Sequence, residues 1–158
     1  MTWRGANTTA DRFFAVLPYL LPLVYGIEFG RFLFNQFPIT QLLFVPLAPL
    51  LQIVYGFPFA GLIIFFLLFL LVVRNPNISH FIRFNTMQAI LLDIVLVLCR
   101  LIFGLLGGAL GSGLVVETLS NVIFLGTLAA VGYSVVQSLM GRYAEIPTIS
   151  EAVHMQVR

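Results

Sequence analysis

Two ionisable residues of opposite sign, Asp93 and Arg100, lie within one long apolar stretch of the sequence. They are seven residues apart, so on a helix they share a face and lie about 10 Å apart along the axis. Arg100 would lean back toward Asp93, because helical side chains tilt toward the N-terminus. A charge at the centre of a bilayer costs at least about 2.5–3.5 kcal/mol, so neither side chain is expected to face lipid. The two residues predict either a polar, water-touched path through the helices or an ion pair that holds them in register.

The segment 77–86, just before this stretch, has the pattern of a short amphipathic helix. Arg83 lies on its polar face and Phe84 on the opposite, aromatic face, a pattern typical of helices at a membrane surface. We expect Arg83 to meet lipid headgroup phosphates. His80 is interpreted as a residue of the polar face rather than a metal ligand, because no second histidine or carboxylate stands at helical spacing beside it.

Two amide side chains, Asn85 and Gln88, stand among the aromatic residues of the same segment. We expect both to turn inward and to form hydrogen bonds with a neighbouring helix. The alternative is that the whole motif is an interfacial anchor with no further role. Its members are His80, Arg83, Phe84, Asn85 and Gln88.

Two further patterns predict how helices are held. Glu28 and Arg31 are three residues apart at the end of the first apolar stretch, so we expect them to neutralise each other near the membrane edge. In the last apolar stretch, small residues recur at every fourth position and predict a face that another helix backbone approaches closely. These residues are Gly126, Ala130, Ser134 and Ser138.

No constellation of residues for catalysis is visible in the sequence. It has no paired carboxylates, no Ser-His-Asp spacing, no metal-ligand cluster and no phosphate-binding loop. We therefore expect no enzyme activity, no metal and no cofactor. The formal charge is only +2, and without a basic run the chain is not expected to bind nucleic acid.

The composition indicates that lipid surrounds most of the chain. Apolar residues make up 60% and charged residues 9%, with a mean hydropathy of +1.05. A soluble domain carries about 25% charged residues, so this chain could not cover a water-facing surface. The predicted fold class is an all-α membrane protein with a single domain.

A membrane helix needs about 20 mostly apolar residues, and we expect four such helices at about 13–33, 59–73, 86–106 and 119–140. The segment 42–55 is also apolar, but Pro46 and Pro49 lie inside it. We interpret it as an interfacial or re-entrant helix on the outer side, because irregular backbone is tolerated at depth only under cover. The alternative is one long, tilted and kinked helix over 42–73. The segment 142–158 is expected to be a polar tail.

The arginines predict the orientation, because positive residues gather on the cytoplasmic side of a membrane. With four spans, six arginines fall on one side and only Arg31 falls on the other. A full crossing at 42–55 would divide the same residues five against two. We therefore expect four spans with both chain ends on the cytoplasmic or stromal side. The six arginines are Arg4, Arg12, Arg74, Arg83, Arg142 and Arg158.

Three parts of the sequence resemble one known family. The string HFIRFNTMQA at 80–89 is similar to the signature before the third span in the Tic translocon channel-subunit family. That family comprises the twenty-kilodalton component of the translocon at the inner chloroplast envelope and its cyanobacterial relatives. Segments 17–20 and 28–30 in the first apolar stretch, and 145–153 in the tail, are similar to the same family. The resemblance covers nearly the whole chain.

The resemblance implies a four-helix membrane protein with both ends stromal or cytoplasmic. It implies a role in moving preproteins across the chloroplast inner envelope or a cyanobacterial plasma membrane. The implied partners are membrane lipids, other translocon subunits or further copies of the chain, and a preprotein substrate. The lack of a transit peptide favours a cyanobacterial or plastid-encoded member.

Two other functions stay open from the residues alone. One is a small-solute or ion transporter, although no repeated pair of broken helices is evident. The other is a non-conducting scaffold or assembly factor, whose arginine-bearing loop would dock lipids or a soluble partner.

Overall fold

A computed structural model describes residues 7–111 and 113–157, and all regular structure in these two ranges is helical. Eight α-helices are joined in places by tighter 3₁₀ or wider π-helical turns. The α-helices are α1 (Thr9–Val16), α2 (Leu20–Gly26), α3 (Arg31–Gln36), α4 (Ala48–Gly56), α5 (Ala60–Leu68), α6 (His80–Leu110), α7 (Leu114–Leu139) and α8 (Ile149–Gln156). The predicted all-α fold is confirmed.

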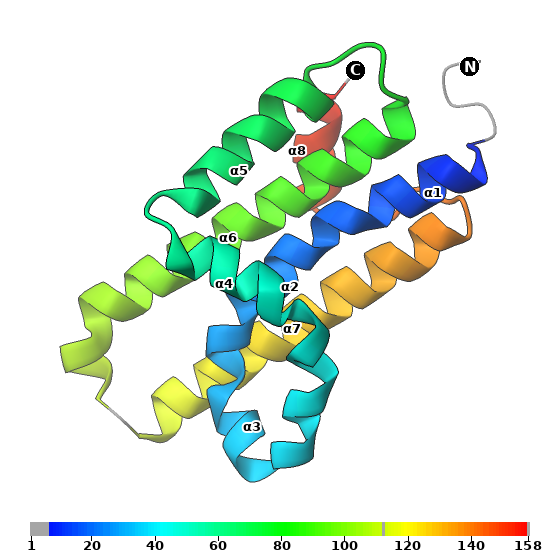
Figure 1. Ribbon diagram of the computed structural model, residues 1–158. Helices are drawn as coiled ribbons and strands as arrows, with labels where there is room; N and C mark the ends of the chain where they lie inside the picture. Colours follow the sequence, from blue (N-terminus) through cyan, green and yellow to red (C-terminus); the bar gives the residue numbers. More distant parts are fainter. Residues whose placement is uncertain (1–6, 112, 158) are drawn as a thin grey trace.

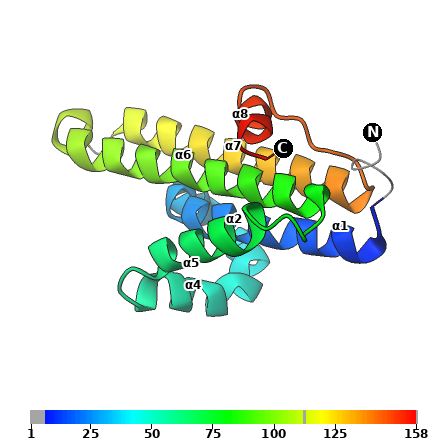
Figure 2. The same cartoon turned by 90° about the horizontal axis from the view of Figure 1, so that it is seen from above.

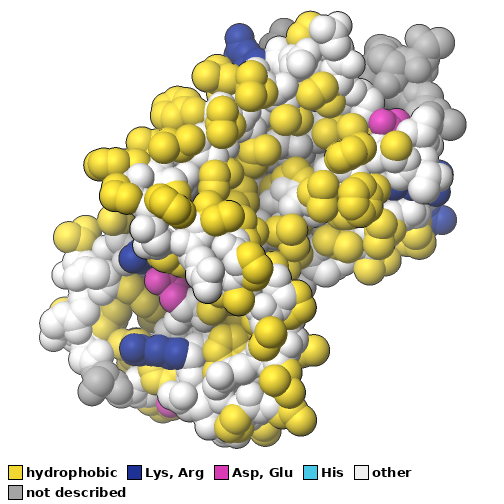
Figure 3. All heavy atoms as spheres, in the orientation of Figure 1, with side chains coloured by type: hydrophobic (Ala, Val, Ile, Leu, Met, Phe, Trp, Pro, Cys, Tyr) yellow, Lys and Arg dark blue, Asp and Glu magenta, His cyan; other side chains and the backbone are white. Residues whose placement is uncertain are grey.

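Four helical elements are long and apolar enough to cross a membrane: Thr9–Gln36, Pro38–Gly56, His80–Leu110 and Leu114–Leu139. Apolar side chains are spread over the whole visible face, and charged groups are few (Figure 3). Large apolar residues stand well exposed along every one of these elements, as Phe13, Leu43, Leu101 and Val122 illustrate. Such a surface is suited to lipid, so the chain is a multi-pass membrane protein.

The first element is one continuous but irregular helix. Thr8 caps it through a reciprocal pair of hydrogen bonds with Asp11. Two 3₁₀ turns, Leu17–Tyr19 and Ile27–Gly30, separate α1, α2 and α3. Pro18 is the second residue of the first of these turns, and proline has no N–H to continue the α-helical ladder. The first element therefore changes helix type at Pro18 instead of continuing as one regular α-helix.

The segment between the first and third long helices differs from the sequence prediction. A 3₁₀ helix, Pro38–Leu47, leads into α4, and α5 continues as a π-helical turn, Phe69–Val73. The α5 unit, Ala60–Val73, falls in the shorter class of apolar helices; at 1.5 Å per residue it covers only about 21 Å. The segment 59–73, which we expected to cross the membrane, is therefore shorter than the helical element Pro38–Gly56. That element contains the segment 42–55, which we expected to lie at the interface. Together α4 and α5 form a helical hairpin that turns at 57–59 (Figure 1).

The separate amphipathic helix expected at 77–86 is not present. Ser79 caps α6 by accepting a hydrogen bond from the Ile82 amide at 3.3 Å, and α6 then runs unbroken from His80 to Leu110. Phe81 and Phe84 are 3% and 0% exposed, so they pack against protein rather than lipid. The aromatic face is covered by the tail, and this removes the reason for the helix to lie in the membrane surface.

The long helices lie side by side, with the hairpin and the tail on opposite faces. In Figure 2, α6 and α7 form one layer, α8 lies on one side of it, and α4 and α5 lie on the other. The start of α1, the segment 74–79 and the end of α7 meet at one end of the bundle, called here the Thr9 end (Figure 1). Asn7 ties this end together by donating to the Gly141 carbonyl at 3.0 Å and accepting from Arg12 at 2.8 Å.

Candidate functional site within the membrane

A buried hydrogen-bond network surrounds Asn85 on α6. The Asn85 Oδ1 atom accepts from the Tyr19 hydroxyl at 2.7 Å and from the Ser138 hydroxyl at 2.9 Å. Its Nδ2 group donates to the Phe81 carbonyl at 2.9 Å. Asn85 and Ser138 are fully buried and Tyr19 is 1% exposed. The network thus joins the first helix, α6 and α7 where no water competes for the bonds.

Gln88, one turn further along α6, connects the same network to the tail. Its Nε2 group donates to the Ala144 carbonyl at 3.0 Å and to the Tyr19 hydroxyl at 3.1 Å, with Ser134 at 3.4 Å. Its Oε1 atom accepts from the Ser150 hydroxyl at 2.8 Å. Both amides therefore turn inward, as expected. The roles of Tyr19 and Ser150 were not predicted from the sequence, because their partners are far away in the chain.

The other members of the interfacial motif contact neighbouring segments of the chain. Arg83 Nε donates to the Val73 carbonyl at 2.8 Å, and so binds the end of the π-helical turn. His80 Nδ1 lies 2.9 Å from the Tyr143 hydroxyl. The Phe84 ring packs edge-on against Tyr143, with ring centres 5.0 Å apart. These contacts anchor the start of the tail to the start of α6.

Asp93 and Arg100 share a face of α6 but do not form an ion pair within the described ranges. Arg100 Nε instead lies 3.6 Å from Glu28 Oε2 of the first helix, and its guanidinium carbon is 6.0 Å from the centre of the Tyr55 ring. The predicted pair of Glu28 with Arg31 is not formed either. The guanidinium of Arg31 lies 4.7 Å from the centre of the Phe32 ring. Glu28 and Arg100, which belong to neighbouring helices, thus pair with each other instead of with the partners expected within their own helices.

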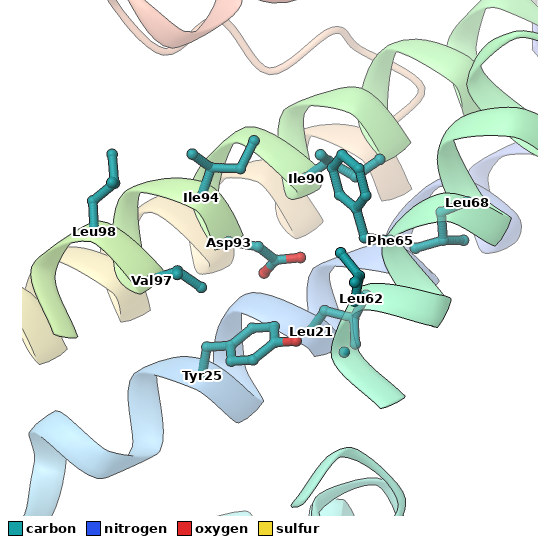
Figure 4. Close-up of a pocket in the computed structure, with 11 residues that line it drawn as sticks. Leu21, Tyr25, Leu62, Phe65, Leu68, Ile90, Asp93, Ile94, Val97 and Leu98 are labelled. Atoms are coloured by element: carbon teal, nitrogen blue, oxygen red, sulfur yellow. The ribbon is translucent and has the colours of Figure 1, made fainter. Parts of the chain in front are cut away.

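Asp93 faces a cavity of about 390 Å³ between α2, α5 and α6. The residue is 9% exposed, and its Oδ1 atom has no hydrogen-bond partner in the described ranges. Figure 4 shows the carboxyl group directed into the space that Leu62 and Phe65 of α5 close from the other side, with Tyr25 beside it. No sequence pattern pointed to Tyr25, because its neighbours come from other helices.

Three polar residues of α6 therefore form a line under the hairpin. Thr86, Asp93 and Arg100 are spaced by seven residues, so they stay on one helix face over about 21 Å. The Thr86 Oγ1 atom, like Asp93 Oδ1, is buried without a hydrogen-bond partner in the part of the chain described. Thr86 lines a second apolar cavity of about 530 Å³, which shares Leu21 and Leu68 with the first. We call Thr86, Asp93 and Arg100 the polar line.

The predicted small-residue ladder on α7 is divided between two environments. Ser134 and Ser138 are buried in the network, whereas Gly126 and Ala130 border a cavity beside α6. A Cβ atom on Gly126 would meet nothing within 4 Å, so this part of the ladder does not bring helices together. The spacing alone could not show which face of α7 is covered.

The close approach occurs instead at two glycines of the first helix. A Cβ atom on Gly26 would lie 3.0 Å from Thr127 of α7, and one on Gly30 would lie 2.8 Å from the Phe124 ring. Gly26 and Gly30 are four residues apart, the small-xxx-small spacing found where membrane helices pack closely. That spacing was visible in the sequence and was not recognised as a packing motif.

Comparisons of the sequence with known proteins identify its family. The profile of a family described as "Chloroplast import apparatus Tic20-like" matches residues 9–153. A Tic20 family protein from a Synechocystis species is 55% identical over 158 residues, covering 98% of this chain and 99% of the relative. The chloroplastic proteins TIC 20-v and TIC 20-II of Arabidopsis thaliana are 38% and 35% identical; they cover 94% and 99% of this chain, which spans 71% and 78% of their lengths.

Proposed function

The chain belongs to the Tic20-like chloroplast import apparatus family, and from this premise we propose that it is a membrane subunit of a protein translocon. In this role it contributes to a path that conducts preproteins across a chloroplast inner envelope or a cyanobacterial membrane. The relatives come from both cyanobacteria and chloroplasts. The role requires no covalent chemistry, so we propose that the chain is not an enzyme.

The observation that carries this proposal is the polar line under the hairpin. Polar and charged groups inside a membrane are costly and mark pathways or helix contacts. Here Arg100 is paired with Glu28, but Asp93 and Thr86 each keep a buried oxygen without a partner in the described ranges. If these residues served only to bridge helices of this chain, both oxygens would have partners within it. The polar line is therefore better suited to contact with another chain.

One such chain is too thin to enclose a polypeptide. The two cavities along the polar line lie under a hairpin whose outer residues are exposed, such as Ile63 at 55% and Leu70 at 58%. We therefore propose that other translocon subunits or further copies complete the path. Lipids cover the remaining apolar surface.

The arrangement of the arginines supports an orientation with the Thr9 end in the stroma or cytoplasm. Arg12, Arg74, Arg83 and Arg142 all belong to segments that meet at this end (Figure 1). Arg31 and Arg100 lie toward the other end. This is the distribution that the positive-inside tendency favours.

Site-specific photocrosslinking tests the function. A photoreactive residue at Leu98 on α6, which lines the Asp93 cavity, should capture a preprotein arrested during import. The matched control is Leu125 on α7, since the exposed fractions are 52% for Leu98 and 53% for Leu125. Equal capture at both positions, or capture at neither, would contradict a conducting role for this face. Ion flux through reconstituted protein without any preprotein would favour a transporter instead.

A further inference from the structure

Asp93 lies within a membrane helix, and its charge has no counter-charge in the described part of the chain. Glu28, an acid of the first helix, has its Oε2 atom 3.6 Å from Arg100 Nε. Asp93 has no basic group in ion-pair range within residues 7–111 and 113–157, and one of its oxygens is buried without a hydrogen-bond partner. In its ionised form, a buried carboxyl group is costly unless an outside group pairs with it.

The depth of Asp93 limits what that outside group can be. Asp93 is ten residues beyond Arg83, which places it about 15 Å further along the helix. The hydrocarbon core of a bilayer is about 30 Å thick. If Arg83 marks the membrane surface, Asp93 lies near the midplane, where a phospholipid headgroup does not reach. The partner must therefore carry its donor group within a membrane-spanning segment.

The cavity beside Asp93 is shaped for an apolar segment with one charged group. Its wall is apolar except for the Asp93 carboxyl and the Tyr25 hydroxyl, and Leu21, Leu62 and Phe65 form much of it (Figure 4). Its volume of about 390 Å³ lies in the range of ligand pockets, about 300–1,000 Å³. The Tyr25 hydroxyl fits against Gly61 only because glycine has no side chain, since a Cβ atom on residue 61 would collide with that hydroxyl.

We propose that this cavity receives a lysine or arginine side chain from a transmembrane helix of a different protein, and that this side chain pairs with Asp93. A second copy of this chain does not fit the role, because its Arg100 is already held by Glu28 and lies about 25 Å beyond Arg83 along the helix, away from the midplane. Arg31 lies against Phe32 near the far end of the first helix. The inference concerns binding in the bilayer and requires no transport step.

Binding of model helices to the intact chain in nanodiscs of zwitterionic lipid tests the inference. The probes are leucine-alanine peptides long enough to span the bilayer, with Lys, Ser, Glu or Leu at the centre. Binding is read by energy transfer to a dye on a cysteine introduced at Met155, which is 69% exposed, in a Cys99→Ser background. The Lys peptide should bind at least about tenfold more tightly than the Leu peptide, and the Glu peptide more weakly than either.

Three variants separate pairing from a general effect on the fold. Asp93→Asn should abolish the preference for Lys, whereas Glu117→Gln on α7 should leave it unchanged. Ile94→Trp keeps the carboxyl group but fills the cavity, and should prevent binding of the Lys peptide. The inference is overturned if all peptides bind equally, or if the preference for Lys survives Asp93→Asn. It is also overturned if the Ser peptide binds as tightly as the Lys peptide, or if the chain associates with itself in a way that depends on Asp93. Crosslinking of a preprotein at Leu98 is a separate measurement, so the proposed function and this inference fail independently.

Discussion

Gln88 of α6 and Ser150 of the tail are 62 residues apart in sequence, and the Ser150 hydroxyl donates a 2.8 Å hydrogen bond to Gln88 Oε1. Ser150 Oγ also accepts from the Ile146 amide at 2.6 Å. A single hydroxyl thus joins the turn before α8 to the centre of the polar network. Val153 and Val157 bury their side chains beside it, so the tail is part of the packed structure rather than a free polar end.

We expect Ser150→Ala to destabilise the protein by about 1–2 kcal/mol. The change leaves Gln88 Oε1 and the Ile146 amide without a partner, and unpaired buried groups cost about 1–3 kcal/mol in soluble proteins and less in membranes. Denaturant unfolding in detergent micelles measures the difference. Thr118→Ala, at an exposed position on α7, is the control and should change stability by less than about 0.5 kcal/mol. Equal stability of the two variants would show that the tail bond contributes nothing.

The Tyr19 hydroxyl bridges the Asn85 and Gln88 side chains. The loss of stability on removing this hydroxyl should therefore depend on whether those amides are present. It donates to Asn85 and accepts from Gln88. A double-mutant cycle of Tyr19→Phe with Gln88→Leu should show a coupling of at least about 0.5 kcal/mol, because groups in one network are not additive. The cycle of Gln88→Leu with Tyr133→Phe, where Tyr133 is 44% exposed, should be additive. Additive behaviour in both cycles would mean that the network bonds do not act as a unit.

The contact of the first helix with α7 predicts opposite effects at two glycines. Gly30→Ala would place a Cβ atom 2.8 Å from the Phe124 ring, and such overpacking typically costs about 1–3 kcal/mol. Gly104→Ala would meet nothing within 4 Å and should be neutral or stabilising, since alanine is the better helix former by about 1 kcal/mol. Thermal unfolding monitored by circular dichroism compares the two. A loss of stability in Gly104→Ala equal to that in Gly30→Ala would refute the close approach at Gly30.

An interaction could be predicted from the sequence only where it depends on local features of the chain. An amide in an apolar helix must find a partner, so the inward turn of Asn85 and Gln88 could be expected from residue type alone. The identity of the partners, Tyr19 and Ser150, depends on the fold and could not. The pairs expected from spacing within one helix, Glu28 with Arg31 and Asp93 with Arg100, gave way to Glu28 with Arg100 because the two helices bring these side chains together.

The exchange of partners between Glu28 and Arg100 gives the last prediction. Glu28→Gln should leave Arg100 beside Tyr55 without a counter-charge, and lower the stability in detergent by about 0.5–1 kcal/mol. The effect is modest because both side chains are partly exposed, at 36% for Glu28 and 56% for Arg100, where pairs are weak. Reversing both charges, as Glu28→Arg with Arg100→Glu, should recover most of the loss seen in either single reversal. Arg31→Gln is the control and should behave as wild type, because Arg31 contacts Phe32 rather than Glu28. If Arg31→Gln matched Glu28→Gln and the double reversal gave no recovery, the pair within the first helix expected from spacing would be the correct one.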